Sequence, residues 1–296
     1  MYNFPIVKFG IVFKAENKKD LEKSFLRSSS FGPFDKLRTP GLEKARMLAK
    51  EVEKWLVKEG QEVLDEKNLK NADVVITLGG DGTLIHKSCE FADLGVPFVG
   101  INTGNLGFLT ACEANDWQES LKKLINGSYF VSERLSVDAA IGGHKEVYRA
   151  INEVVVRGLY RVVDLEIKVG GVKLLRVLGD GVIVSTQTGS TAYSLSAGGP
   201  IVDPDLDCLL LTPINPIGLP IPSAVFSAES EIEVKLVKGD DVSLVLDGQE
   251  HTRLNEGDKV KITRGKYKIK FIYFDKHHFI KSLNAKFGLS SRSVGQ

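Results

Sequence analysis

Cysteine is scarce in this 296-residue chain, which contains only Cys89, Cys112 and Cys208. An odd number of widely spaced cysteines fits neither a disulfide framework nor a zinc site with paired ligands. Long apolar runs are also lacking: no stretch approaches the roughly 20 residues of a membrane span, and no basic region followed by an apolar one opens the chain. We therefore expect a protein of the reducing cytoplasm that is neither exported nor inserted into a membrane.

An excess of charge of either sign is missing too. The chain has 39 Lys and Arg against 38 Asp and Glu, which gives a formal net charge of +1. Such a chain has no global field to attract a polyanion, so we expect no nucleic acid as a partner. Hydrophobic residues make up 43% of the sequence, enough to fill one large core or two ordinary ones.

Several catalytic and metal-binding signatures are absent as well. The chain has no Gly-x-Ser-x-Gly elbow, and its GGDGT segment lacks the Lys and Ser or Thr that complete a Walker phosphate loop. Asp203, Asp205 and Asp207 are spaced like calcium ligands, but no glycine or distal glutamate completes the loop, and we interpret them as a solvated turn. His277 and His278 are adjacent and so cannot share a helix face around a metal.

The first 130 residues alternate between strand and helix patterns. Apolar β-branched runs predict strands at 6–13, 72–78 and 96–101. Helical spacing of apolar residues predicts helices at 42–59, 83–91 and 117–125. This order predicts a Rossmann-like α/β domain, residues 1–130, with a parallel sheet covered on both faces. The segment 17–41 has no consistent period, and we interpret it as a mobile loop or insertion, with an active-site lid as the alternative.

The remainder of the chain has a different pattern. From residue 131 to about 276, short β-rich runs alternate with Gly, Asp and Asn turns, which predicts a β-rich domain. A final helical pattern at 277–287, within the closing segment 277–296, is expected to pack back on the first domain.

Two glycine-rich segments follow predicted strands of the first domain. Gly79, Gly80, Asp81, Gly82 and Thr83 come between a strand and a helix, where open parallel sheets bind ligands. Glycines let backbone amides approach a phosphate, and a carboxylate at Asp81 could hold a metal or accept a hydroxyl proton. The alternative is that Asp81 only caps the helix. The segment 102–108 follows the next strand and could line the same crevice, or form an ordinary loop anchored by Phe108.

Polar residues also mark the β-rich half. The segment 188–200, TGSTAYSLSAGGP, offers hydroxyls and a tyrosine ring that could hold a nucleotide, although capping and turn formation would explain it too. Asn152 and Glu153 precede a wholly apolar strand and suit hydrogen bonding to a ribose diol, with a strand-end turn as the alternative. Asp180, before Gly181, has the same ambiguity.

Five segments together carry a resemblance. They are GGDGT (79–83), NTGNLGFLT (102–110), NE (152–153), GDG (179–181) and TGSTAYSLSAGGP (188–200). In this order the set resembles the NAD kinase family, from about Val74 to Gln249. The resemblance implies transfer of the γ-phosphoryl group of ATP, or of polyphosphate, to the 2′-hydroxyl of the adenosine ribose of NAD, giving NADP. It also implies Mg²⁺ as a cofactor and a homodimer or homotetramer.

The resemblance further implies roles for single residues. Asp81 would be the general base and an indirect or weak Mg²⁺ ligand. The phosphate donor would meet the loop residues Gly79, Gly80, Gly82, Thr83, Asn102 and Gly104. The residues that would contact NAD are Asp81, Gly82, His86, Asn152, Glu153, Arg161, Asp180, Thr191, Ala192, Tyr193, Ser194, Leu195, Ser196 and Gln249.

The chain departs from the family pattern at two places. His86 stands where members commonly carry a basic residue, and an exposed helical histidine is the alternative interpretation. The segment 212–226 lacks the His and the Arg-Pro that often follow TPI-x-P, which bears on subunit contacts or donor binding. Lipid kinases and phosphofructokinase-like sugar kinases also use a GGDG loop, but neither is expected to carry TGSTAYSLSAGGP. A non-catalytic NAD(P)-binding regulator is a further alternative, against which the intact Asp81 argues.

Overall fold

The computed structural model describes residues 6–13, 39–104, 107–218 and 220–288. The chain divides into two compact units, residues 1–132 with 270–296, and residues 133–269. Of the expected insertion 17–41, all but the last three residues lie outside the described residues. Among the residues that the structure describes, no helix has both the length and the apolar character needed to cross a membrane.

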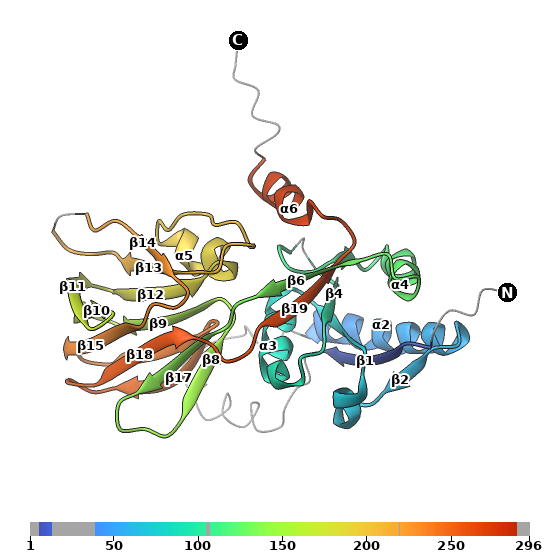
Figure 1. The fold of residues 1–296 in the computed structure, drawn as a ribbon, viewed down its shortest axis with the longest axis horizontal. Helices are drawn as coiled ribbons and strands as arrows, with labels where there is room; N and C mark the ends of the chain where they lie inside the picture. The colour runs from blue at the N-terminus through green and yellow to red at the C-terminus, as the bar shows by residue number, and fades with distance from the viewer. Residues whose placement is uncertain (1–5, 14–38, 105–106, 219, 289–296) are drawn as a thin grey trace, which may run out of the picture. The chain divides into compact units, whose positions relative to one another are not determined.

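The first unit is built on a seven-stranded sheet in the order β2-β1-β3-β4-β19-β6, with β5 paired to β4 (Figure 1). Its strands are β1 (Lys8–Phe13), β2 (Glu62–Leu64), β3 (Val74–Gly79), β4 (Phe98–Asn102), β5 (Cys112–Glu113), β6 (Phe130–Arg134) and β19 (Ile269–Tyr273). The neighbours of β1, β3 and β4 all run parallel to them, which confirms the predicted parallel α/β sheet.

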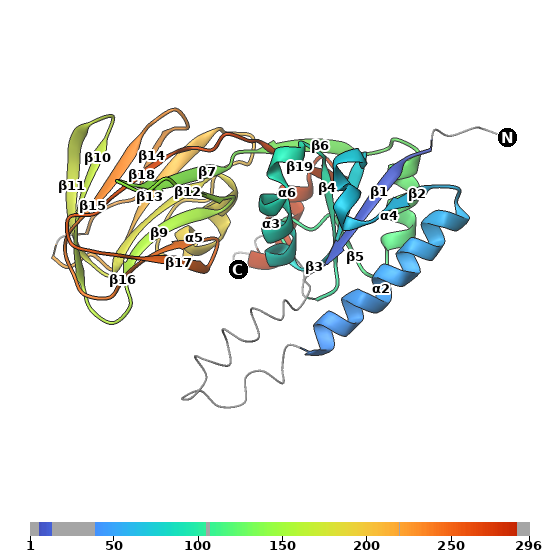
Figure 2. The same ribbon diagram turned by 90° about the horizontal axis from the view of Figure 1, so that it is seen from below.

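Helices cover both faces of this sheet (Figure 2). They are α2 (Thr39–Lys58), α3 (Asp81–Glu90), α4 (Trp117–Ile125) and α6 (His278–Phe287), with short 3-10 turns at Glu66–Asn71 and Ala92–Leu94. Apolar residues of α2 and α4 share one core with Ile76 of β3 and Ile101 of β4. Leu84 of α3 lies against Gly100 of β4. Successive residues of a strand face opposite sides of the sheet, so α3 covers the face opposite to that of Ile101.

The amphipathic pattern of α2 explains its position. Its buried side chains, Ala45, Leu48, Ala49, Val52 and Leu56, recur every three or four residues and so form one stripe. Trp55 of α2 and Trp117 of α4 meet edge to face, with ring centroids 5.4 Å apart.

The C-terminal helix α6 packs back on the first unit, as the sequence predicts. The ring of Phe287 lies 6.0 Å from the ring of Phe108, in the loop that follows β4. His278, at the start of α6, stacks on Tyr273 of β19 with the two centroids 4.4 Å apart.

The second unit consists of two six-stranded sheets in the orders β11-β10-β15-β18-β7-β8 and β14-β13-β12-β9-β16-β17, which confirms the predicted β-rich half. The strands of these sheets pair antiparallel with their neighbours, and apolar side chains of both sheets share one core. The strands of the first sheet are β7 (Val137–Ile141), β8 (Val147–Ala150), β10 (Val163–Val169), β11 (Val172–Gly179), β15 (Ile232–Lys238) and β18 (Lys259–Arg264). The strands of the second sheet are β9 (Glu153–Gly158), β12 (Gly181–Thr186), β13 (Cys208–Ile214), β14 (Ala224–Ser227), β16 (Val242–Leu246) and β17 (Gln249–Leu254).

We predict that Leu121→Ala destabilises the first unit by about 2–5 kcal/mol, because Leu121 is fully buried between α4 and the sheet and its loss leaves a cavity. Both tryptophans of the chain, Trp55 and Trp117, lie in this unit, so tryptophan fluorescence during urea unfolding reports on it. The exposed Lys122→Ala on the same helix is the matched control. Equal unfolding midpoints for the two variants would contradict this account of the core.

Candidate active site

Asp81 is the first residue of α3 and follows the carboxyl end of β3. The turn that presents it depends on Gly79, whose φ of +155° is rarely adopted by other residues. A Cβ at Gly79 would also overlap the side chain of Thr83. Glycine at position 79 is therefore needed for the close turn that places one carboxylate at the edge of the sheet.

The carboxylate of Asp81 accepts hydrogen bonds from three successive amides of the loop after β4. Oδ2 accepts from the amide of Phe108 at 2.5 Å, and Oδ1 accepts from the amides of Leu109 and Thr110 at 3.1 Å each. The hydroxyl of Thr110 lies 3.3 Å from Oδ1. These four donors belong to the second glycine-rich segment and not to α3, so Asp81 does more than cap its own helix.

Gly107 makes this approach possible. A Cβ at Gly107 would overlap Oδ1 of Asp81 and the hydroxyl of Thr110. Asn102 shapes the start of the same loop: its Oδ1 accepts from the amide of Gly104 at 2.9 Å, and its Nδ2 donates to Glu113 at 3.2 Å. The structure thus brings the two glycine-rich segments together through Asp81. Asn102 and Gly104 were expected as site residues and Gly107 only as a member of the segment 102–108, whereas the roles of Gly107 and of the three amides were not predicted.

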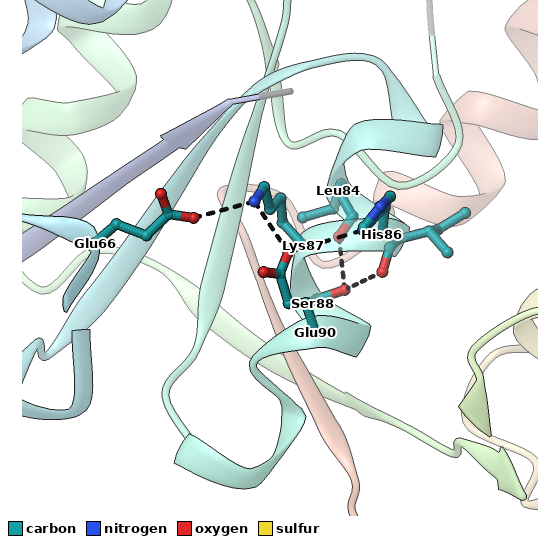
Figure 3. Close-up of polar contacts among 7 residues, drawn as sticks. Glu66, Leu84, His86, Lys87, Ser88 and Glu90 are labelled. Carbon is teal, nitrogen blue, oxygen red and sulfur yellow. Dashed lines mark hydrogen bonds and ion pairs between the residues drawn. The ribbon is translucent and has the colours of Figure 1, made fainter. Parts of the chain in front are cut away.

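The neighbouring residues His86 and Lys87 of α3 both interact with acidic side chains, which the sequence did not show (Figure 3). His86 is exposed, and its Nδ1 lies 3.9 Å from a carboxylate oxygen of Glu90. Lys87 instead donates to Glu66 at 3.1 Å and to Glu90 at 2.9 Å. Burial of Lys87 lowers its pKa, but these two carboxylates outweigh burial and raise the pKa overall. Lys87 is therefore engaged by acidic neighbours, whereas the contact of His86 with NAD stays a prediction.

In the second unit, Asp247 organises the segment that leads into β9. Its carboxylate accepts from the amides of Ile151 at 2.8 Å, Asn152 at 2.7 Å and Glu153 at 3.1 Å. Asp247 has a φ of +47° in the turn between β16 and β17, where Gly248 follows with +76°. No sequence pattern pointed to this role of Asp247.

Glu153 lies next to that carboxylate and is almost fully buried, with 5% of its surface exposed. Burial, followed by the negative charge of Asp247, raises the pKa of Glu153 to about 8. No described residue offers a hydrogen-bond partner to its Oε2. Glu153 is therefore largely protonated at neutral pH, and a protonated carboxyl can donate a hydrogen bond as well as accept one.

The hydroxyl-rich segment 188–200 begins at the end of the sheet where Asn152 and Glu153 lie. Thr186, the last residue of β12, donates through its hydroxyl to the carbonyl of Ile151 at 2.6 Å and through its amide to the carbonyl of Asn152 at 2.9 Å. A Cβ at Gly189 would overlap the carbonyl of Asn152, so glycine is required there. The segment begins with a 3-10 turn, Thr188–Thr191, which is followed by the four-residue α5 (Tyr193–Ser196).

The predicted ligand residues of α5 differ in their surroundings. Tyr193 packs in part against the apolar cluster of Val155, Ile183 and Ile214. The hydroxyl of Ser194 is buried and lies 2.9 Å from that of Thr212, so part of the atypical segment 212–226 supports this turn. The remaining residues of the motif named as ligands are partly buried or exposed: Thr191, Ala192, Leu195 and Ser196.

Asp180 and Arg161 lie at the other end of the strands. Because β9 and β12 are antiparallel, Asp180 pairs near Gly158, whereas Asn152 lies beside Thr186. Six-residue strands separate the two ends by about 17 Å. Asp180 is exposed and accepts from the Nδ2 of Asn215 at 2.8 Å. The structure thus groups Asn152, Glu153 and the 188–196 segment with the turn of Gln249, but not with Asp180 or Arg161.

A glycine-bordered carboxylate at the carboxyl edge of a parallel sheet, beside a second glycine-rich loop, suits a phosphotransferase, because ligands bind at this edge and phosphoryl transfer depends on aligned groups. Family comparison agrees with this class. The ATP-NAD kinase N-terminal domain model matches residues 36–129, and the ATP-NAD kinase C-terminal domain model matches residues 151–274.

Individual relatives point the same way. The NAD kinase of Symbiobacterium thermophilum is 41% identical over 220 residues, which cover 72% of this chain and 78% of that protein. The solved NAD kinase of Archaeoglobus fulgidus in complex with ATP is 27% identical, with a TM-score of 0.69 over 97% of this chain and 100% of that one. Yeast NADH kinase complexed with NADH, at 23% identity and a TM-score of 0.75 over 100% of this chain and 92% of that one, shows the same fold. The chain belongs to the NAD kinase family, and by this homology it is an enzyme with NAD kinase activity.

We predict that Gly107→Ala lowers kcat by roughly 100-fold, because the added methyl group would displace Asp81 by about 1 Å. Gly142→Ala, whose methyl group would meet its nearest atom at 3.7 Å, is the control. NADP formation by the two purified variants is the measurement. If Gly107→Ala turned over like the control, the close approach of the two loops would not matter for catalysis.

We also predict that the contribution of Glu153 to the stability of the ligand-free protein falls as the pH rises from about 4.5 to about 8. In this window the folded protein keeps the proton of Glu153, whereas the unfolded chain has lost it, so each rise in pH favours unfolding. Glu153→Gln removes this contribution and should flatten the dependence relative to the exposed Glu146→Gln. Thermal unfolding followed by circular dichroism at several pH values checks this, and parallel curves for the two variants would refute the burial of a proton at Glu153.

Proposed function

We propose that the enzyme transfers the γ-phosphoryl group of ATP to the 2′-hydroxyl of the adenosine ribose of NAD, producing NADP and ADP. The 2′-oxygen forms the new bond to phosphorus, the bond to the bridging oxygen of ADP breaks, and the hydroxyl proton passes to Asp81. The observation that supports Asp81 as the base is its carboxylate at the edge of the sheet, oriented by the amides of Phe108, Leu109 and Thr110.

Phosphoryl transfer asks for alignment and charge neutralisation more than for covalent groups on the protein. We propose that the donor phosphates are met by the two glycine-rich segments, through Gly79, Gly80, Gly82, Thr83, Asn102 and Gly104. The exposure of Gly82 and Gly104 supports this, because a phosphate can approach both residues from solvent, although the amide of Gly104 already donates to Oδ1 of Asn102. ATP as the donor is supported by the ATP complex of the Archaeoglobus fulgidus relative, and polyphosphate is a second donor to be tested.

Mg²⁺ would neutralise charge on the transferred group. Among the described residues, no cluster of three or more His, Cys, Asp or Glu side chains could hold a metal ion. Both carboxylate oxygens of Asp81 already accept hydrogen bonds from amides. This donor set fits a Mg²⁺ ion held mainly by the phosphates of the nucleotide, with Asp81 as an indirect or weak ligand.

The dinucleotide is proposed to be contacted by the polar end of β9 and by the turn that follows β12. Asn152, the protonated Glu153 and the residues from Thr191 to Ser196 supply amide, carboxyl and hydroxyl groups suited to a ribose diol. His86, Arg161, Asp180 and Gln249 are proposed as further contacts. A cytoplasmic homodimer or homotetramer is the assembly that the family resemblance favours.

We predict that Asp81→Asn lowers turnover by roughly 10²- to 10⁴-fold, as expected for the loss of a general base. NADP formation from NAD with ATP and Mg²⁺ is the assay, and NADH and polyphosphate are tested as alternative substrates. The exposed Asp93→Asn in the same unit is the matched control. Tryptophan fluorescence establishes that both variants are folded, and near-full activity of folded Asp81→Asn would exclude the proposed role.

A further inference from the structure

The C-terminal helix α6 contacts Phe108, whose backbone amide donates a hydrogen bond to Asp81. Nε2 of His278 lies 3.1 Å from the carbonyl oxygen of Phe108. The ring of Phe108 lies 6.0 Å from that of Phe287, and Nζ of Lys286 lies 4.4 Å from its centroid. Three residues of one helix therefore contact a single residue of the loop.

The contact of His278 continues to Asp81 through one peptide group. The carbonyl of Phe108 and the amide of Leu109 belong to the same planar unit, so fixing the oxygen also fixes the N–H. That N–H donates to Oδ1 of Asp81 at 3.1 Å. The preceding amide, of Phe108, donates to Oδ2 at 2.5 Å. Hydrogen bonds in such a chain strengthen one another, because each polarises the next.

The geometry also defines the state of His278. A carbonyl oxygen only accepts, so Nε2 must carry a proton for this contact to be a hydrogen bond. The imidazole is stacked on Tyr273 of β19 at an interplanar angle of 25°, which holds the ring in its plane. The hydroxyl of Ser282, one turn further along α6, lies 3.5 Å from the same nitrogen.

We propose that His278 is a positioning residue for Asp81, acting through the peptide group between Phe108 and Leu109. This inference rests on the proposed function, in which Asp81 handles the ribose hydroxyl. His278 reaches Asp81 through this one peptide group, so its loss acts on the orientation of the loop amides and of the carboxylate that they hold. The helix at the end of the chain is then part of the catalytic apparatus and not only a cover for the sheet.

This role predicts a particular kinetic signature. Residues assigned to nucleotide contact keep their positions in a His278 variant, so the KM for NAD stays within about twofold. The alignment of Asp81 is lost, so kcat falls by roughly 10- to 100-fold. A residue that only stabilised the fold would lower the amount of active enzyme without changing the exchange of the loop amides.

Three variants separate the hydrogen bond from packing. His278→Leu removes the N–H donor, His278→Gln keeps an N–H donor on a side chain of similar reach, and the exposed His277→Leu is the matched control on the adjacent residue. We expect the fall in kcat for His278→Leu, recovery to within about threefold of wild type for His278→Gln, and no change for His277→Leu. Hydrogen exchange of the amides of residues 108–110 should accelerate only in His278→Leu.

Wild-type kcat for folded His278→Leu, or an equal loss in the Leu and Gln variants, would overturn the proposal. If His278→Leu fails to fold by tryptophan fluorescence, Phe287→Leu provides the second variant, because it loosens Phe108 while leaving His278 in place. Faster exchange of the 108–110 amides with lower kcat then supports the proposal, and unchanged exchange and kcat overturn it. Asp81→Asn distinguishes failure of the proposed function from failure of the role of His278. If Asp81→Asn stays active, the proposed function fails. If Asp81→Asn is inactive while His278→Leu turns over normally, only the role of His278 fails.

Discussion

The hydrogen bonds between the carboxylate of Asp81 and the amides of residues 108–110 connect the two loops at the carboxyl edge of the first sheet. A carboxylate that is partly removed from water is costly unless donors replace the lost hydration, and three amides with one hydroxyl do so here. Each loop thus supplies hydrogen-bond partners to the other. The requirement for glycine follows from this contact, because at Gly107 a side chain would occupy the space of the carboxylate.

The sequence predicted those features of this site that depend on the order of neighbouring elements along the chain. β3 and β4 are consecutive parallel strands, so the loops that follow them had to end at one edge, and GGDGT identified the carboxylate. The partners of Asp81 were not predictable, because backbone amides leave no mark in the identity of residues 108–110. The pairing of β19 with β4 is also non-local, since about 170 residues separate them in the chain, and no short-range pattern encodes it.

In the second unit too, the sequence did not predict contacts between residues that are far apart in the chain. Asn152, Glu153 and the hydroxyl-rich segment were identified from their residue types, and their convergence follows from the antiparallel pairing of β9 with β12. The same pairing separates Asp180 and Arg161 from them by the length of a strand, which motif order alone could not reveal. Asp247 was missed as an organising residue because its three hydrogen bonds go to amides almost one hundred residues earlier.

In both units, therefore, one carboxylate accepts hydrogen bonds from three consecutive amides, but the electrostatic consequences differ. Around Asp81 the nearest hydrogen-bonding partners are donors, so the carboxylate and its loop stabilise each other. Around Asp247 a second carboxyl group, Glu153, lies in the same buried region, and two negative charges in one low-dielectric site repel. Asp247 already has three amide donors, whereas Oε2 of Glu153 has no partner among the described residues, so the proton belongs on Glu153. The neutral carboxyl is thus a consequence of how the neighbouring turn is built, and it gives the end of β9 a hydrogen-bond donor where the sequence shows an acid.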